Sequence, residues 1–320
     1  MTATGALLAA PFAAVAQPTG KVYRIGYLGS TSASGYHAQL VDAFRRGLRD
    51  LGYVEGRDLT IEYRWAEGKY DRLPQLAAEL VRLPVDLIVT HGTPGSRAAK
   101  QMTTTVPIVM AISGDAVATG LVTSIARPGG NLTGSTFFFP ELMAKRLELL
   151  KEAVPRANRI TAFANADNLA TRPALTAMAL RAESLTVDVA AVQVRGPGEF
   201  ASAFLAMAKA RADGVVVIDD PMLIANAQHI ADLAAKHRIP AIGDREYVDV
   251  GGLMAYAVNF PDAWRHAAVF VDKILKGANP GELPVEQATR FDVVINLKAA
   301  RALELTIPQS LLLRATQILE

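Results

Sequence analysis

From Lys21 onward the sequence alternates short apolar runs with amphipathic segments, and this alternation constrains the fold more than any other feature. The runs 22–28, 85–90 and 106–112 are nearly continuous in apolar residues, which is typical of strands buried on both faces of a parallel sheet. The segments between them, such as 37–52 and 70–83, carry apolar residues at helical spacing. We therefore predict an α/β fold in which helices cover both faces of parallel sheets.

The alternation runs through the chain twice, which predicts two Rossmann-like, doubly wound lobes joined by a multi-strand hinge. A chain of 320 residues also exceeds the length at which a single hydrophobic core usually stops growing. The first round covers 21–136 and the second covers 137–252. We expect 253–282 to return to the first lobe and 283–320 to the second.

Composition excludes several classes of protein. Hydrophobic residues make up 51% and charged residues 20%, which is typical of a folded globular chain. A net charge of +2 gives no basic footprint for nucleic acid. No run after the first twenty residues reaches the roughly 18 apolar residues of a membrane helix. We expect a monomer that is neither membrane-embedded nor bound to nucleic acid.

The first twenty residues have the character of an export signal. They are apolar and rich in alanine, and Ala14, Val15 and Ala16 precede Gln17 in an A-x-A cleavage pattern. The usual positive charge is missing, because the first Lys or Arg is Lys21. The chain has no cysteine, which excludes a lipid-anchored N-terminal Cys and disulfide bonds. We predict a signal remnant over 1–20 and a periplasmic mature protein.

Short polar residues follow the apolar runs of both rounds. Ligands of open parallel sheets bind beyond the carboxyl ends of the strands, so these residues are candidates for ligand contact. The candidates are Ser30, Thr31, Thr93, Pro94, Asp115, Asn165, Asp219, Asp220, Asp244 and Tyr247.

Most of these residues also have a purely structural interpretation. Thr93 before Pro94, like Asp220 before the next proline, suits an N-cap followed by proline at the first helical position. Asn165 suits a turn. The two roles are compatible, because the free N–H groups of a helix start also bind carboxylates. Asp115, in a loop of small residues with no proline behind it, is the candidate that a cap explains least.

Enzyme signatures are absent from the sequence. The glycines near residue 26 do not match G-x-G-x-x-G, and there is no phosphate-binding loop and no G-x-S-x-G elbow. His229 and His237 lie eight residues apart, too far for a two-histidine metal site. His37 and His91 flank candidate loops and could contact a ligand, although we rank them below the hydroxyls. We predict no catalytic residue, metal or cofactor.

Four stretches, 92–109, 115–134, 251–260 and 267–315, resemble the ABC-transporter substrate-binding family that includes tryptophan- and tyrosine-binding members. The resemblance implies a periplasmic-binding-protein type I fold, in which two lobes joined by a three-stranded hinge clamp a ligand. It implies capture of a small polar molecule, such as an amino acid, aromatic ones included, or a related carboxylate, and its delivery to a membrane permease. Carried over by position, the contacts are the ten candidates named above.

The sequence departs from the family pattern at two places. Family members often carry Asp-Pro where this chain has Asp115-Ala116, and they commonly carry SYGPN at 255–259, which here reads AYAVN. Both places lie near the expected cleft or hinge, so the ligand can differ from those of known members. Two alternatives stay open: a periplasmic sensor subunit, and an isomerase or racemase that uses paired carboxylates such as Asp115 and Asp219.

Overall fold

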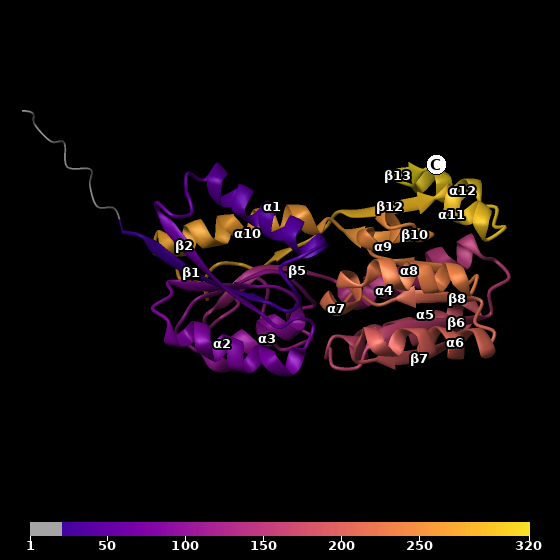
Figure 1. Cartoon of the computed structure of the whole chain (residues 1–320), viewed down its shortest axis with the longest axis horizontal. Helices are drawn as coiled ribbons and strands as arrows, with labels where there is room; N and C mark the ends of the chain where they lie inside the picture. Colours follow the sequence, from indigo (N-terminus) through magenta and orange to yellow (C-terminus); the bar gives the residue numbers. More distant parts are fainter. Residues whose placement is uncertain (1–20) are drawn as a thin grey trace, which may run out of the picture.

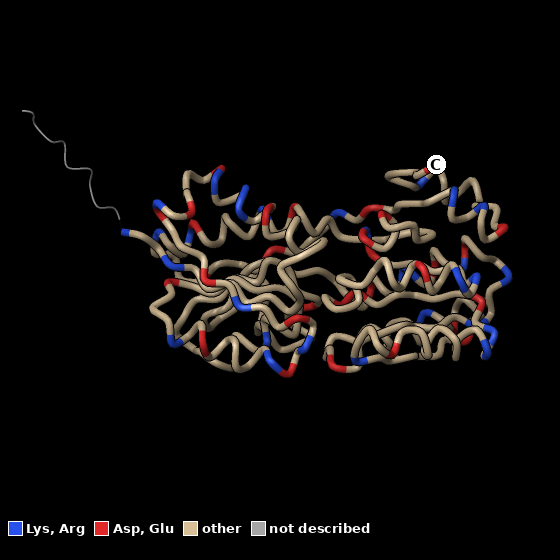
Figure 2. The backbone as a smooth tube through the Cα atoms, viewed as in Figure 1, with Lys and Arg blue, Asp and Glu red and all other residues tan. Residues whose placement is uncertain are grey.

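The computed structural model describes residues 21–320, which form two lobes placed end to end along the longest axis of the molecule (Figure 1). The predicted export signal over 1–20 lies outside the described residues. In Figure 2, Lys and Arg residues and Asp and Glu residues are interspersed along the backbone of both lobes.

The first lobe is built on a six-stranded parallel sheet. Apolar side chains of α1 and α10 pack on one face of this sheet, and those of α2 and α3 pack on the other. The strands, in order across the sheet, are β2 (Leu59–Trp65), β1 (Tyr23–Gly29), β3 (Leu87–Thr90), β4 (Ile108–Gly114), β5 (Leu132–Phe137) and β11 (Glu286–Gln287). The helices are α1 (Tyr36–Asp50), the short η1 (Tyr70–Arg72), α2 (Leu73–Arg82), α3 (Gly92–Met102) and α10 (Phe260–Leu275).

The second lobe is built on a seven-stranded sheet that is parallel except where β10 pairs with β12. The strands, in order, are β7 (Asp188–Val194), β6 (Arg159–Asn165), β8 (Gly214–Val217), β9 (Ala241–Gly243), β10 (Met254–Val258), β12 (Phe291–Asn296) and β13 (Gln317–Leu319). The helices are α4 (Phe139–Ala153), α5 (Thr171–Leu185), η2 (Pro197–Glu199), α6 (Phe200–Lys209), α7 (Pro221–Ala225), α8 (Ala227–Lys236), α9 (Arg245–Asp249), α11 (Leu297–Ala302) and α12 (Gln309–Arg314).

The chain crosses between the lobes from β5 to α4, from β10 to α10 and from β11 to β12. These crossings correct two expected boundaries. Residues 254–258 belong to the second lobe, because β10 hydrogen-bonds to β9 and β12. Residues 286–287 belong to the first lobe, because β11 pairs with β5. Helix α10 packs against α1 in the first lobe, where its segment was expected.

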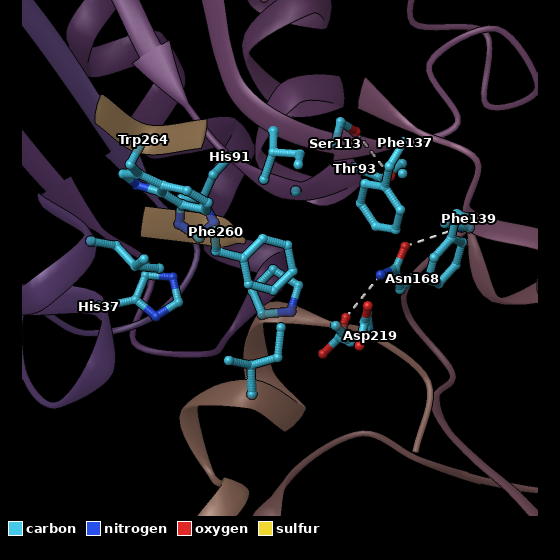
Figure 3. A pocket seen from close by; sticks show the side chains of 18 residues that line it. His37, His91, Thr93, Ser113, Phe137, Phe139, Asn168, Asp219, Phe260 and Trp264 are labelled. Carbon is cyan, nitrogen blue, oxygen red and sulfur yellow. Dashed lines mark hydrogen bonds between the residues drawn. The ribbon is translucent and has the colours of Figure 1, made fainter. Parts of the chain in front are cut away.

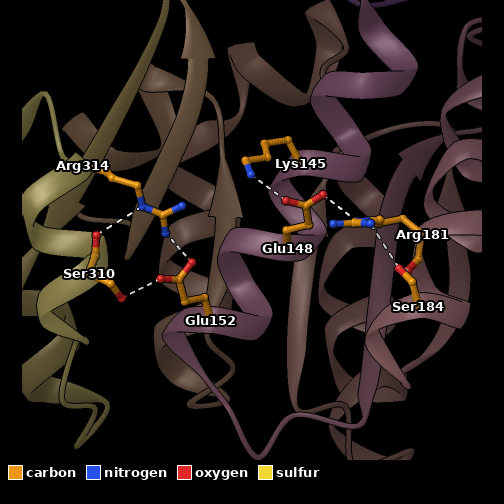
Figure 4. A network of polar contacts seen from close by, with 7 residues as sticks. All are labelled: Lys145, Glu148, Glu152, Arg181, Ser184, Ser310 and Arg314. Atoms are coloured by element: carbon orange, nitrogen blue, oxygen red, sulfur yellow. Dashed lines mark hydrogen bonds and ion pairs between the residues drawn. The ribbon is translucent and has the colours of Figure 1, made fainter.

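Helix α4, which follows the first crossing, is held in place by ion pairs on its outer surface (Figure 4). Glu148 contacts Lys145 at 2.6 Å and Arg181 of α5 at 2.5 Å. Glu152 contacts Ser310 and Arg314 of α12. Each exposed pair contributes little by itself. Together they hold α4 in place. This helix also carries Arg146, whose side chain is buried in the core.

Candidate functional site

A cavity lies between the lobes, at the carboxyl ends of β3 and β4 in the first lobe and of β8 in the second (Figure 3). The volume of this cavity is about 50 Å³. The residues that line it are His37, Leu40, His91, Gly92, Thr93, Ile112, Ser113, Gly114, Phe137, Phe139, Asn168, Ala170, Asp219, Asp220, Pro221, Ile224, Phe260 and Trp264.

Aromatic rings form a continuous wall on the first-lobe side of this cavity. The ring centroids of His37 and His91 are 4.6 Å apart, and those of His91 and Trp264 are 5.2 Å apart. Phe260 continues the wall: its ring centroid lies 6.0 Å from that of Trp264 and 6.5 Å from that of Phe137. Such a wall suits a planar ring or a large apolar group, because aromatic pairs gain contact energy at these separations.

Gly92 and Thr93, in the first turn of α3, line the cavity. Gly92 has a φ of 67°, a conformation that glycine adopts without strain. The N–H groups of Gly92 and Thr93 have no acceptor inside the helix, so they can bind an anion. The Thr93 hydroxyl lies 3.2 Å from that of Ser113. The predicted N-cap at Thr93 is wrong, because the helix begins at Gly92 with His91 in the N-cap position.

On the second-lobe side, Asp220 is the N-cap of α7, as its place before proline predicts. Burial raises the pKa of Asp220, and the hydrogen bonds that it accepts oppose this shift. Five groups donate to the Asp220 carboxylate at 2.9–3.2 Å: the backbone N–H groups of Met222 and Leu223, the amides of Asn165 and Asn168, and the hydroxyl of Tyr70. These hydrogen bonds hold this part of the cavity wall in place.

Tyr70 joins the two lobes directly. It belongs to η1 in the first lobe, and its hydroxyl donates to Oδ2 of Asp220 at 2.9 Å. The same hydroxyl accepts from the backbone N–H of Met222 at 3.1 Å. The structure is therefore a closed form, in which the opposing edges of the cavity touch.

Asp219 lines the cavity and forms a buried ion pair. One of its oxygens lies 2.7 Å from Nη1 of Arg146, whose side chain is fully buried, and the other has no partner among the described residues. Asp244 caps α9 through the N–H of Tyr247 at 2.9 Å, and its second oxygen also lacks a partner there. Burial and then the charge of Asp219 raise the pKa of Asp244 to about 7. Arg146 thus pairs with Asp219, while Asp244 keeps its proton up to near neutral pH.

Several predicted contacts lie outside the cavity lining. Ser30 and Thr31 are buried, and their hydroxyls have no partner among the described residues. Pro94 borders a separate surface groove between α3 and the loop at 167–169. Asn165 acts through Asp220, as described above, and Tyr247 is buried in the core of the second lobe. Of the ten candidates, those that line the cavity are Thr93, Asp219 and Asp220.

Asp115 does not reach the cavity lining either. Its Oδ1 accepts from the backbone N–H groups of Val117 at 3.1 Å and Ala118 at 2.9 Å. The carboxylate thus caps the turn after β4, because a short side chain in a tight loop reaches its own backbone first. In this structure Asp115 therefore acts as a cap through one of its two carboxylate oxygens. The structure also leaves an isomerase without the carboxylate pair of Asp115 and Asp219.

Sequence reasoning named His37 and His91 of the aromatic wall but missed Phe260 and Trp264. Phe260 and Trp264 come from α10, which joins the first lobe only after the chain has passed through the second. Phe137 is the last residue of β5, directly before the first crossing. The one available signal was the spacing of Phe260 and Trp264, four residues apart and therefore on one face of a helix.

The model of the ABC transporter substrate binding protein family matches residues 35–319 of the chain. The chain belongs to this family. Its relatives include the tyrosine-binding protein of Clostridioides difficile strain R20291, 25% identical over 263 residues, 82% of this chain and 75% of that one. Family membership makes the chain a solute-binding protein, and it favours binding over catalysis as the role of the cavity. Among the described residues no helix is long and apolar enough to span a bilayer.

Solved structures of relatives show the same two-lobe, type I fold. The ABC domain of Streptococcus pneumonia in complex with L-Trp is 25% identical, with a TM-score of 0.86 over 93% of this chain and 100% of that one. A conserved domain protein from Vibrio cholerae is 28% identical, with a TM-score of 0.85 over 93% and 100%. A ligand-free, open structure from Clostridium difficile reaches 0.64 over 93% and 99%, at 23% identity.

Proposed function

We propose that this chain captures an amino acid with an aromatic or large apolar side chain, or a related aromatic carboxylate, for an ABC importer. One observation carries the proposal. The interlobe cavity combines an unpartnered oxygen of Asp219, the free N–H groups at the start of α3 and an aromatic wall. A zwitterionic head and an apolar side chain need these three elements together.

The charged head of the ligand would sit across the lobe boundary. Its ammonium would pair with the free oxygen of Asp219, whose other oxygen is held by Arg146. Its carboxylate would accept from the N–H groups of Gly92 and Thr93, which the positive end of α3 favours. Because the two contacts come from opposite lobes, the ligand would stabilise the closed form over the open one.

Delivery and location follow from this proposal. The closed form would dock on a membrane permease, and the mature chain would act as a monomer in the periplasm after removal of the segment over 1–20. The names of two relatives support an aromatic amino acid as the solute, since one is called tyrosine-binding and the other was solved with L-Trp.

Calorimetric titration with matched ligands tests the proposal. Phenylalanine and 3-phenylpropionate differ only in the ammonium group, as do tryptophan and indole-3-propionate. We expect Asp219→Asn to weaken the amino acid by about tenfold to a hundredfold, and the deaminated compound far less. Asp115→Asn is the control, because this carboxylate lies outside the cavity lining and should leave both affinities unchanged. An equal loss for both members of a pair would assign Asp219 a purely structural role and contradict the proposed head site.

A further inference from the structure

His37 is a cavity-lining side chain that the proposed head site does not use. It is 3% exposed, and neither Nδ1 nor Nε2 has a hydrogen-bond partner among the described residues. The other polar side chains of the aromatic wall do have partners. His91 accepts from the N–H of Ser30 at 3.3 Å, and Trp264 donates to the hydroxyl of Tyr27 at 3.2 Å.

The chemistry of the His37 ring is well defined. Burial lowers the pKa of His37 to about 4, so the ring is neutral at physiological pH. A neutral imidazole carries one N–H donor and one acceptor nitrogen. Buried polar groups of this kind are nearly always hydrogen-bonded in folded proteins. His37 lines the cavity and has no hydrogen-bond partner among the described residues, so a group in the cavity can supply one.

The position of His37 fixes which part of the ligand it meets. His37 and Trp264 lie at one end of the group of side chains, whereas Asn168 and Asp219 lie at the other (Figure 3). A ligand whose ammonium reaches Asp219 therefore directs the far end of its side chain toward His37. The rings between the two ends hold the apolar middle of the ligand.

We propose that the ligand carries a hydrogen-bonding group, a hydroxyl or a ring N–H, at the end distal to its charged head, and that His37 selects for it. This inference rests on the proposed function and specifies its substrate class: hydroxylated or heteroaromatic amino acids rather than purely hydrocarbon ones. A site built around a buried hydrogen bond rejects the analogue that lacks the group, because the buried partner is then left unpaired.

Two pairs of ligands test the inference, each differing only at the distal end. Tyrosine carries a hydroxyl that phenylalanine lacks, and tryptophan carries an N–H that 1-methyltryptophan lacks. In calorimetric titrations of the wild-type chain, we expect the first member of at least one pair to bind about tenfold or more tighter than the second. In His37→Phe, which keeps an aromatic ring in place, we expect that ratio to fall to about one.

His37→Gln is the matched control, because an amide retains both a donor and an acceptor. His37→Gln should keep part of the preference for the hydrogen-bonding ligand that His37→Phe loses. The affinity ratios of the two ligand pairs for the wild type give a result even if a variant does not fold. Equal binding of both members of each pair to the wild type would overturn the inference and leave the proposed function standing. A His37→Phe variant that keeps the full wild-type preference would likewise overturn the inference and leave the proposed function standing. Binding of none of the four compounds would overturn the inference, and the titrations with 3-phenylpropionate and indole-3-propionate would then test the proposed function separately.

Discussion

The hydroxyl of Tyr70 is the contact whose removal most clearly separates closure of the lobes from folding. It donates to Asp220 across the lobe boundary at 2.9 Å and accepts from Met222 at 3.1 Å. In an open form these groups would face water instead. Tyr70→Phe keeps the ring and deletes only the bridge, so it should weaken the closed state without disturbing either lobe.

The size of the effect follows from what remains at Asp220. A hydrogen bond to a charged group contributes about 1.5–3 kcal/mol. The lower end applies here, because Asp220 keeps the donors Asn165 and Asn168 and the two N–H groups of α7. A loss of about 1.5 kcal/mol corresponds to roughly tenfold in Kd. The full loss appears in the apparent Kd if the unliganded protein is mostly open, since that Kd scales inversely with the closed fraction.

Calorimetric titration of wild type and Tyr70→Phe with the same ligand measures the effect. Tyr53→Phe is the matched control, because the hydroxyl of Tyr53 donates to Asp272 at an equal 2.9 Å but lies wholly within the first lobe. We expect the control to keep wild-type affinity while its melting temperature falls slightly. If Tyr70→Phe also keeps its affinity to within twofold, the bridge does not stabilise the closed state and this reasoning is refuted.

Two further perturbations test other parts of the structure. A Cβ at Gly92 would lie 2.8 Å from Cγ of Pro221 in the opposite lobe, so Gly92→Ala should lower ligand affinity by more than its backbone strain explains. Gly120→Ala, at a similar positive φ with open space around it, should lower stability only, as thermal melts and titrations of both variants would show. Burial and the neighbouring charge of Asp219 raise the pKa of Asp244 to about 7 from 3.8, so the folded state binds this proton more tightly than the unfolded state. Wild type should therefore lose stability relative to Asp244→Asn as the pH rises from 4 to 7, and a constant difference in melting temperature across that window would contradict this.

Much of the fold could be predicted because it depends on the local periodicity of apolar residues. Near-continuous apolar runs are typical of strands buried on both faces, and they indicate the parallel sheets directly. The boundaries after residue 252 could not be predicted in the same way. Whether β10 pairs with β9 of the second lobe or joins the first lobe with α10 depends on long-range pairing, and no local pattern encodes it.

The site was partly accessible for a related reason. Polar residues after strands are visible in the sequence. A carboxylate there, however, can either contact a ligand or cap a nearby helix or turn. Asp220 and Asp244 act as helix caps, and Asp115 caps a turn, because their own backbone N–H groups are the nearest donors. Asp219 instead pairs through one oxygen with Arg146, more than seventy positions away, and its other oxygen has no partner among the described residues.

The most direct test of the account is a crystal structure of the mature chain with the tightest-binding compound from the titrations. The account predicts closed lobes with the ammonium of the ligand within hydrogen-bond distance of Asp219 and its carboxylate at the N–H groups of Gly92 and Thr93. It also predicts the side chain of the ligand against Phe260 and Trp264. Density for the ligand in another groove, or in this cavity with its charged head reversed away from Asp219, would contradict the central claim.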